Sequence, residues 1–98
     1  MKKIKDIVTV RNENMGVTIA RFIFENGWTL SCKLDRWATE VAVFNPEDAW
    51  MSATVFKEVF GRSYAYAAGM RDKECVVENV TPEELEQLAN YIADIKEN

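Results

Sequence analysis

The chain has 98 residues, 48% hydrophobic and 29% charged, with a formal net charge of −4; this composition excludes a disordered chain and predicts one domain over residues 1–98. It contains no histidine and only two cysteines, which excludes a Cys–His pair and a disulfide scaffold, so both cysteines should be reduced thiols. No segment resembles a signal peptide or a membrane span, so we expect a cytoplasmic protein that does not bind membranes.

Residues 4–10 are predicted to form the first strand, because Ile4, Val8 and Val10 share one parity in a period-two pattern. The polar segment 11–16 that follows is rich in turn-forming residues and closes with a glycine. The chain should therefore reverse there and return as a second strand.

Residues 17–34 predict a β-hairpin around Glu25-Asn26-Gly27. A two-residue loop would divide the large side chains between the two faces, so we favour a three-residue loop with Gly27 at positive φ. This loop pairs the apolar residues of the two strands directly: Phe24 with Trp28, Phe22 with Leu30, and Ala20 with Cys32. The same register turns a mixed set of side chains to the second face: Ile19, Arg21, Ile23, Thr29, Ser31 and Lys33.

The middle of the chain predicts one strand and one short helix. Residues 40–44 have strong β-propensity, and Asn45-Pro46-Glu47-Asp48 ends the run either as a turn or as a helix N-terminus; we favour a turn. Apolar residues at helical spacing before Gly61 predict a short helix over residues 53–60. Within the following stretch, residues 64–66 alternate as in a strand.

The strongest helix signal lies at the C-terminal end of the chain. Thr81-Pro82-Glu83-Glu84 forms a capping box with proline in the first turn. An apolar stripe follows: Leu85, Leu88, Ala89, Ile92 and Ile95. The helix should span residues 82–96. Together these elements predict an α+β fold, a small antiparallel sheet of about four strands with the C-terminal helix packed on it and one additional short helix.

Few residues are placed to carry catalytic or metal chemistry, and the glycines form no phosphate-binding loop. Four carboxylates are able to meet across loops as an acid–base pair or a Mg²⁺ site, but we favour solvated loop charges: Asp35, Glu40, Glu47 and Asp48. Cys32 lies near Lys33, which would lower its pKa, yet its place in the apolar series favours a buried structural thiol. We therefore predict no enzymatic activity, no cofactor and no catalytic metal.

Aromatic and arginine residues outside the clearest strand patterns are the candidates for a partner-binding surface, because these types dominate interface energetics. They are Arg36, Trp37, Trp50, Arg62, Tyr64 and Tyr66. The alternative is that some of the aromatic residues complete a small core.

Acidic residues are concentrated in the last part of the chain. Residues 72–98 carry eight acidic side chains and two lysines, a charge of −6, so the chain lacks a basic footprint and nucleic acid is not an expected partner. This segment is either a solvated helix face or a surface that imitates DNA phosphates. We favour the helix face, because Glu83 and Glu84 already serve the helix N-terminus.

Four segments in chain order carry a resemblance: Asn26-Gly27-Trp28-Thr29-Leu30-Ser31, Glu40-Val41-Ala42-Val43-Phe44, an acidic turn leading to Trp50, and Val80-Thr81-Pro82-Glu83-Glu84-Leu85. This order resembles small, uncharacterised proteins encoded by tailed bacteriophages, in which a hairpin and a strand precede a Thr-Pro-Glu-Glu helix. The resemblance covers about half the chain. The stretch between about residues 51 and 79 departs from it as an apparent insertion, and no functional residue can be transferred.

The resemblance implies a protein that acts by binding a host protein. The leading hypothesis is therefore a non-enzymatic protein-binding module, a phage-encoded modulator or inhibitor of a host protein or defence system in the host cytoplasm. Two alternatives remain, a homo-oligomeric structural or accessory protein that associates through the second face of the sheet, and an acidic DNA mimic. An enzyme working through carboxylates alone is the weakest hypothesis.

Overall fold

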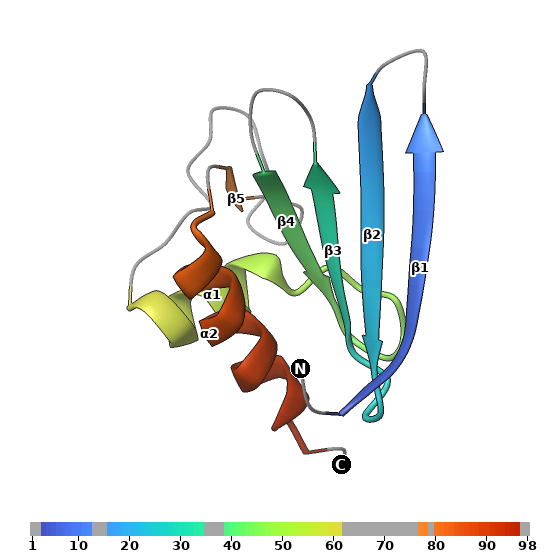
Figure 1. The fold of residues 1–98 in the computed structure, drawn as a ribbon. Helices are drawn as coiled ribbons and strands as arrows, with labels where there is room; N and C mark the ends of the chain where they lie inside the picture. The colour runs from blue at the N-terminus through green and yellow to red at the C-terminus, as the bar shows by residue number, and fades with distance from the viewer. Residues whose placement is uncertain (1–2, 13–15, 35–38, 62–76, 79, 97–98) are drawn as a thin grey trace.

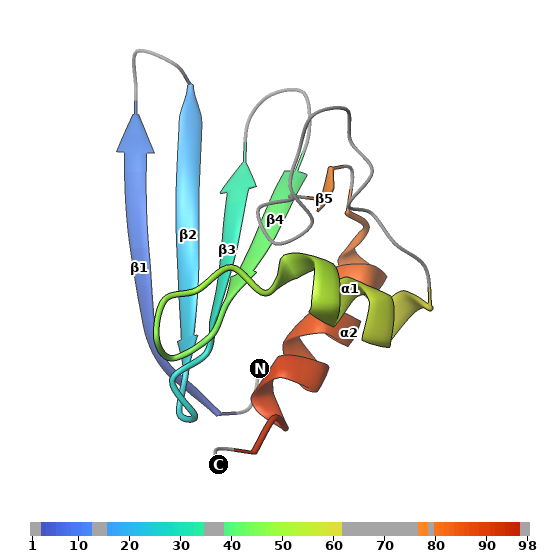
Figure 2. The ribbon, with the colours of Figure 1, turned by 180° about the vertical axis from the view of Figure 1, so that it is seen from behind.

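The computed structural model describes residues 3–12, 16–34, 39–61, 77–78 and 80–96. Its elements follow in the order β1 (Ile4–Asn12), β2 (Val17–Phe24), β3 (Thr29–Leu34), β4 (Thr39–Phe44), α1 (Ser52–Phe60), β5 (Val77–Glu78) and α2 (Pro82–Ala93). The strands form one antiparallel sheet in the order β1-β2-β3-β4-β5. Helix α2 lies over one face of the sheet, and α1 lies beside β4 and α2 (Figures 1 and 2).

The α+β architecture and the antiparallel sheet are confirmed, with four long strands where they were expected. Two differences are local. The two-residue strand β5 extends the sheet beyond the four predicted strands, because Val77 pairs with Val41 at the edge of β4. Helix α2 ends at Ala93, three residues before the predicted end.

The three-residue hairpin loop is confirmed. Ala20 pairs with Cys32 and Phe22 pairs with Leu30, and the Phe24 N–H donates to the Trp28 carbonyl at 2.9 Å. Gly27 has a φ of 89°, in the region that a side chain disfavours. Alternation of large apolar residues along the two strands therefore fixed the register, and glycine made the loop possible.

Replacement of Gly27 by valine should lower the free energy of unfolding by about 1 kcal/mol or more, because a β-branched residue is strained at this φ. A Cβ atom here would also lie 3.1 Å from the Pro46 Cβ, so the turn after β4, which contains Pro46, must shift. Denaturant unfolding measures the change. Gly61→Val is the control, since Gly61 has a φ of 68° but no atom near its Cβ position. Equal losses in the two variants would contradict the proposed contact with Pro46.

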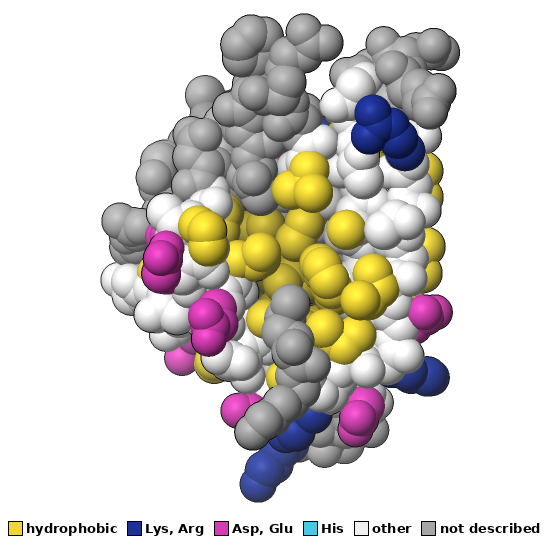
Figure 3. All heavy atoms as spheres, viewed as in Figure 1, with side chains coloured by type: hydrophobic (Ala, Val, Ile, Leu, Met, Phe, Trp, Pro, Cys, Tyr) yellow, Lys and Arg dark blue, Asp and Glu magenta, His cyan; other side chains and the backbone are white. Residues whose placement is uncertain are grey.

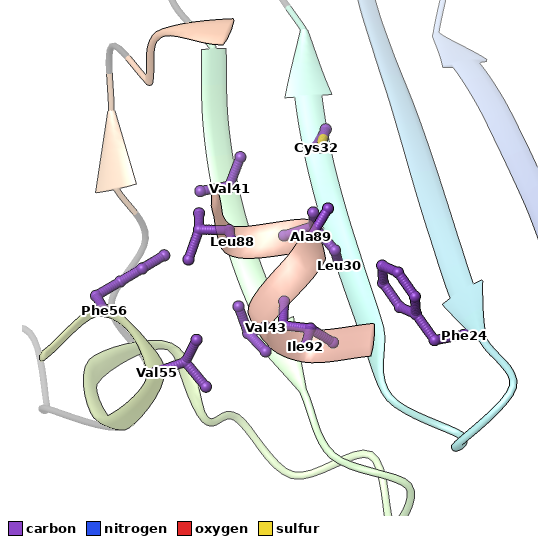
Figure 4. Close-up of a cluster of buried hydrophobic side chains, with 10 residues drawn as sticks. All are labelled: Phe24, Leu30, Cys32, Val41, Val43, Val55, Phe56, Leu88, Ala89 and Ile92. Carbon is purple, nitrogen blue, oxygen red and sulfur yellow. The ribbon is translucent and has the colours of Figure 1, made fainter. Parts of the chain in front are cut away.

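The core lies between α2, α1 and the face of the sheet that α2 covers. It gathers apolar side chains from each of these elements (Figure 4): Phe24, Leu30, Cys32, Val41, Val43, Val55, Phe56, Leu88, Ala89 and Ile92. Leu88 and Ile92 are fully buried, as the predicted docking of the C-terminal helix requires. The capping box is present, with the Thr81 side chain accepting from the Glu84 N–H at 3.1 Å.

The hairpin loop explains why α2 ends early. The Asn26 side-chain amide donates to the carbonyls of Ile92 and Ile95, at 2.8 and 2.9 Å. In the same turn, the N–H groups of Asp94 and Ile95 donate to carbonyls three residues back, which tightens the end of the helix. The loop between β2 and β3 therefore caps the carbonyl end of α2, a contact between segments far apart in the sequence.

Candidate functional site

The face of the sheet opposite α2 is a mixed surface of apolar and charged side chains, here called the open face. The strand register arranges it in three rows across β1 to β4, which are Asp6-Ile23-Thr29-Phe44, Val8-Arg21-Ser31-Ala42 and Val10-Ile19-Lys33-Glu40. Neither described helix packs on it, because α2 covers the other face and α1 lies beside β4 (Figure 2). The second face predicted for the hairpin is thus confirmed, and β1 and β4 extend it.

The turn after β4 brings Trp50 to this face. The Asn45 Oδ1 accepts from the N–H groups of Glu47 and Ala49, at 3.0 and 2.9 Å, and Asp48 has a φ of 64°. Asn45 therefore organises a tight turn rather than a helix N-terminus, as predicted, and α1 begins only at Ser52. The chain doubles back along β4, where Trp50 forms a β-bridge with Phe44.

A buried serine holds the returning chain in place. The Ser52 Oγ accepts from the Val43 N–H at 2.9 Å, and the Met51 N–H donates to the Val43 carbonyl at 2.8 Å. Both backbone groups of Val43 that face the edge of the sheet are therefore satisfied by the start of α1. Ser52 is fully buried, and the sequence analysis did not single it out.

Three side chains cluster where the turn meets the open face. The rings of Phe44 and Trp50 pack edge to face, with centroids 4.7 Å apart and planes at 64°. The Arg21 guanidinium carbon lies 5.3 Å from the centre of the Phe44 ring, a cation–π distance. No carboxylate of the described residues forms an ion pair with Arg21. This arginine therefore leaves its hydrogen-bond donors available to a bound molecule.

A hollow of about 210 Å³ lies beside this cluster, lined by residues of β2, β3 and β4 together with Trp50. Its wall includes the apolar Ile19 and Phe44 and the charged pair Lys33 and Glu40. The Lys33 Nζ and Glu40 Oε2 are 3.8 Å apart and partly exposed, so this ion pair is weak. The hollow combines an apolar floor with charged groups at its rim, the usual chemistry of a protein-binding pocket.

Only one of the predicted partner-binding residues lies within the described structure. Trp50 is half-buried against Phe44 on the open face. The others lie outside the described residues: Arg36, Trp37, Arg62, Tyr64 and Tyr66. Sequence reasoning missed Phe44 and Arg21 as site residues. Arg21 already lay on the second face of the predicted hairpin, but only the pairing of β4 with β3 placed Phe44 on the same face.

The remaining chemical candidates do not converge on this site. Cys32 is buried on the opposite face, and burial raises the pKa of its thiol to about 11, so it is a structural thiol as favoured above. Glu47 and Asp48 are exposed in the turn, Glu40 is near Lys33, and Asp35 lies outside the described residues. Within the described ranges, no three metal-ligating side chains are grouped.

A larger hollow, of about 1030 Å³, lies along α2 on the other side of the sheet, where Figure 3 shows apolar side chains gathered. Leu85 and Ala93 contribute apolar surface to it, and Lys3 bonds Asp94 at its rim with 2.9 Å between Nζ and Oδ1. That hydrogen bond raises the pKa of Lys3. Both groups are largely exposed, so the pair contributes little to stability.

Comparison of the chain with protein-family models, with curated proteins and with solved structures found no match. In the part of the chain that the structure describes, no helix has the length and apolar character needed to cross a bilayer.

Proposed function

We propose that this protein is a non-enzymatic protein-binding module, whose partner contacts the open face around Trp50, Phe44 and Arg21. The observation that carries the proposal is the edge-to-face aromatic pair beside a hollow, with an arginine that no described carboxylate neutralises. Tryptophan, tyrosine and arginine carry a large share of the binding energy in protein interfaces.

The hollow also suggests the chemistry of the partner. Its volume of about 210 Å³ suits one large apolar side chain, the usual anchor of a protein interface. Lys33 and Glu40 line the hollow, and Arg21 lies beside it in the neighbouring row of the open face, next to Ser31 and Ala42. We therefore expect the anchor of the partner to be flanked by acidic side chains, since opposite charges steer association and fix orientation.

The resemblance of the hairpin, strand and Thr-Pro-Glu-Glu helix to tailed-bacteriophage proteins supports a host protein as this partner. In this proposal the protein modulates or inhibits a host enzyme or defence system by occupying its surface. The DNA-mimic alternative gains no support from α2, because Glu84 belongs to the capping box and Glu83 lies in the first turn.

Alanine at Trp50 should weaken partner binding by about 1–2 kcal/mol, roughly 5- to 30-fold, because it removes the largest apolar group at the site. Arg21→Gln tests the same surface without opening a cavity and should weaken binding as well. Wild-type and variant proteins are immobilised and exposed to a bacterial host lysate, and captured proteins are quantified by mass spectrometry.

Tyr91→Ala is the matched control, because Tyr91 is an exposed aromatic residue on α2, away from the open face. It should capture the same partner as the wild type. Thermal unfolding is measured for every variant. Loss of stability without selective loss of capture in Trp50→Ala and Arg21→Gln would contradict the proposal, and loss of self-association instead would favour the structural-oligomer alternative.

A further inference from the structure

The two edges of the sheet differ in how they are protected. The outer edge of β4 is covered by the chain around Trp50 and Met51 and by β5. No described residue pairs with the outer edge of β1, a strand of nine residues without proline. Three of its apolar side chains are exposed: Ile7 at 53%, Val8 at 40% and Val10 at 58%. Natural sheets protect long apolar edges from pairing; β1 has a bulge near Lys5 and charged side chains at Lys5, Asp6 and Arg11, while Ile7 to Val10 carry no charge.

The hydrogen-bond pattern identifies the backbone groups that β1 offers. In β2, the Phe24 N–H donates to β3, at Trp28. Because backbone groups of successive residues point to opposite sides of a strand, the N–H and C=O groups of Ile19, Arg21 and Ile23 point to β1. Their partners in β1 therefore point their own N–H and C=O groups toward β2: Asp6, Val8 and Val10. The residues between these have outward-facing backbone groups: Ile7, Thr9 and Arg11.

We propose that a second copy of this chain occupies the edge, with the two β1 strands paired antiparallel about a two-fold axis at Thr9. In this register Thr9 lies opposite Thr9 of the second copy, and Ile7 lies opposite Arg11. Each of these is a hydrogen-bonded pair, so every outward-facing N–H and C=O of the three residues gains a partner. The inference is independent of the proposed function, because it concerns the edge and not the open face.

The side chains disfavour two neighbouring registers. On the open face, Val8 lies opposite Val10 of the second copy, and no like charges are opposed. A two-fold axis at Val8 would set Lys5 opposite Arg11, and an axis at Ile7 would set Arg11 opposite Lys3. Like charges directly opposite one another destabilise a strand pair, so the charges of β1 favour the axis at Thr9 over these two.

The dimer has a defined shape and strength. A two-fold axis perpendicular to the sheet joins the two sheets edge to edge and turns both open faces to the same side. The helices lie over the opposite end of the strand order and leave β1 clear (Figure 1). Strand pairing alone buries less than the roughly 1,600 Å² of a standard interface, so the dimer should depend on protein concentration.

Sedimentation velocity from roughly 10 μM to 1 mM spans the affinities of such small interfaces and tests the proposal. The wild type should shift from monomer to dimer across this range. Thr9→Pro removes an outward N–H that the monomer does not use, and proline is tolerated in an edge strand, so this variant should remain monomeric. Thr9→Val keeps the N–H and should dimerise as the wild type does.

A second variant covers the case in which Thr9→Pro does not fold. Val10→Lys places a charge on an exposed side chain and opposite Val8 of the second copy, so it should also reduce the dimer fraction at least several-fold. A wild type that stays monomeric at every concentration, or dimers that persist in Thr9→Pro and Val10→Lys, would overturn the proposal. Dimers lost in Trp50→Ala but retained in both β1 variants would assign self-association to the open face.

Discussion

Replacement of Leu88 by alanine is expected to lower the free energy of unfolding by roughly 3 kcal/mol, the typical loss for a leucine truncated in a packed core. Leu88 is fully buried between α2 and the sheet and lies in one cluster with Val41, Val43 and Phe56 (Figure 4). For a chain of this length, a loss of that size lowers the midpoint of thermal unfolding by roughly 12–24 °C. Calorimetry or urea unfolding measures it.

Gln87→Ala provides the control on the same helix, because Gln87 is exposed and adjacent in sequence. Its stability should stay within about 0.5 kcal/mol of the wild type. A loss below about 1 kcal/mol for Leu88→Ala would mean that α2 does not dock through this stripe. The docking of the C-terminal helix would then need another contact.

The buried thiol of Cys32 is expected to make stability fall at alkaline pH. Burial raises its pKa from 9.0 to about 11 in the folded protein. Above pH 9 the unfolded chain releases the thiol proton while the folded chain retains it, so the unfolded state is stabilised relative to the folded state as pH rises toward 11. This group should therefore remove about 2 kcal/mol of stability between pH 8 and pH 11, at 1.36 kcal/mol per pKa unit.

Cys32→Ala isolates this contribution from the other groups that titrate at alkaline pH. The variant should be less stable than the wild type near pH 8, because it loses buried volume, but its stability should fall less steeply toward pH 11. The two proteins are compared by denaturant unfolding at matched pH values. Parallel pH profiles would show that the thiol reaches solvent in the folded state.

The hairpin and the C-terminal helix were predictable because their signals are local. Alternating apolar residues on both sides of Gly27 admit only one register that keeps the large side chains together. The Thr81 capping box and the apolar stripe that follows define where α2 begins and which side it buries. Asn45 also marked a turn correctly, since its side chain bonds backbone groups within four residues.

The candidate site was less predictable, and the sequence identified only Trp50 among its described members. Both faces of the hairpin carry apolar side chains, so the sequence did not show which residues of β4 would join which face. Phe44 became a site residue only when the turn folded Trp50 back onto it. Arg21 gained its role from the same event, because its guanidinium lies over the Phe44 ring.

The sequence by itself determined the four long strands, the hairpin register, the position of both described helices and the absence of histidine chemistry, since these depend on residue type and on neighbours a few positions away. The tertiary structure decided that no described residue pairs with the outer edge of β1, that the chain around Trp50 covers β4, and that Asn26 caps the end of α2. Such contacts join segments up to 69 residues apart. Their formation depends on the packing of all the elements together, because loop closure and burial balance only in the complete fold.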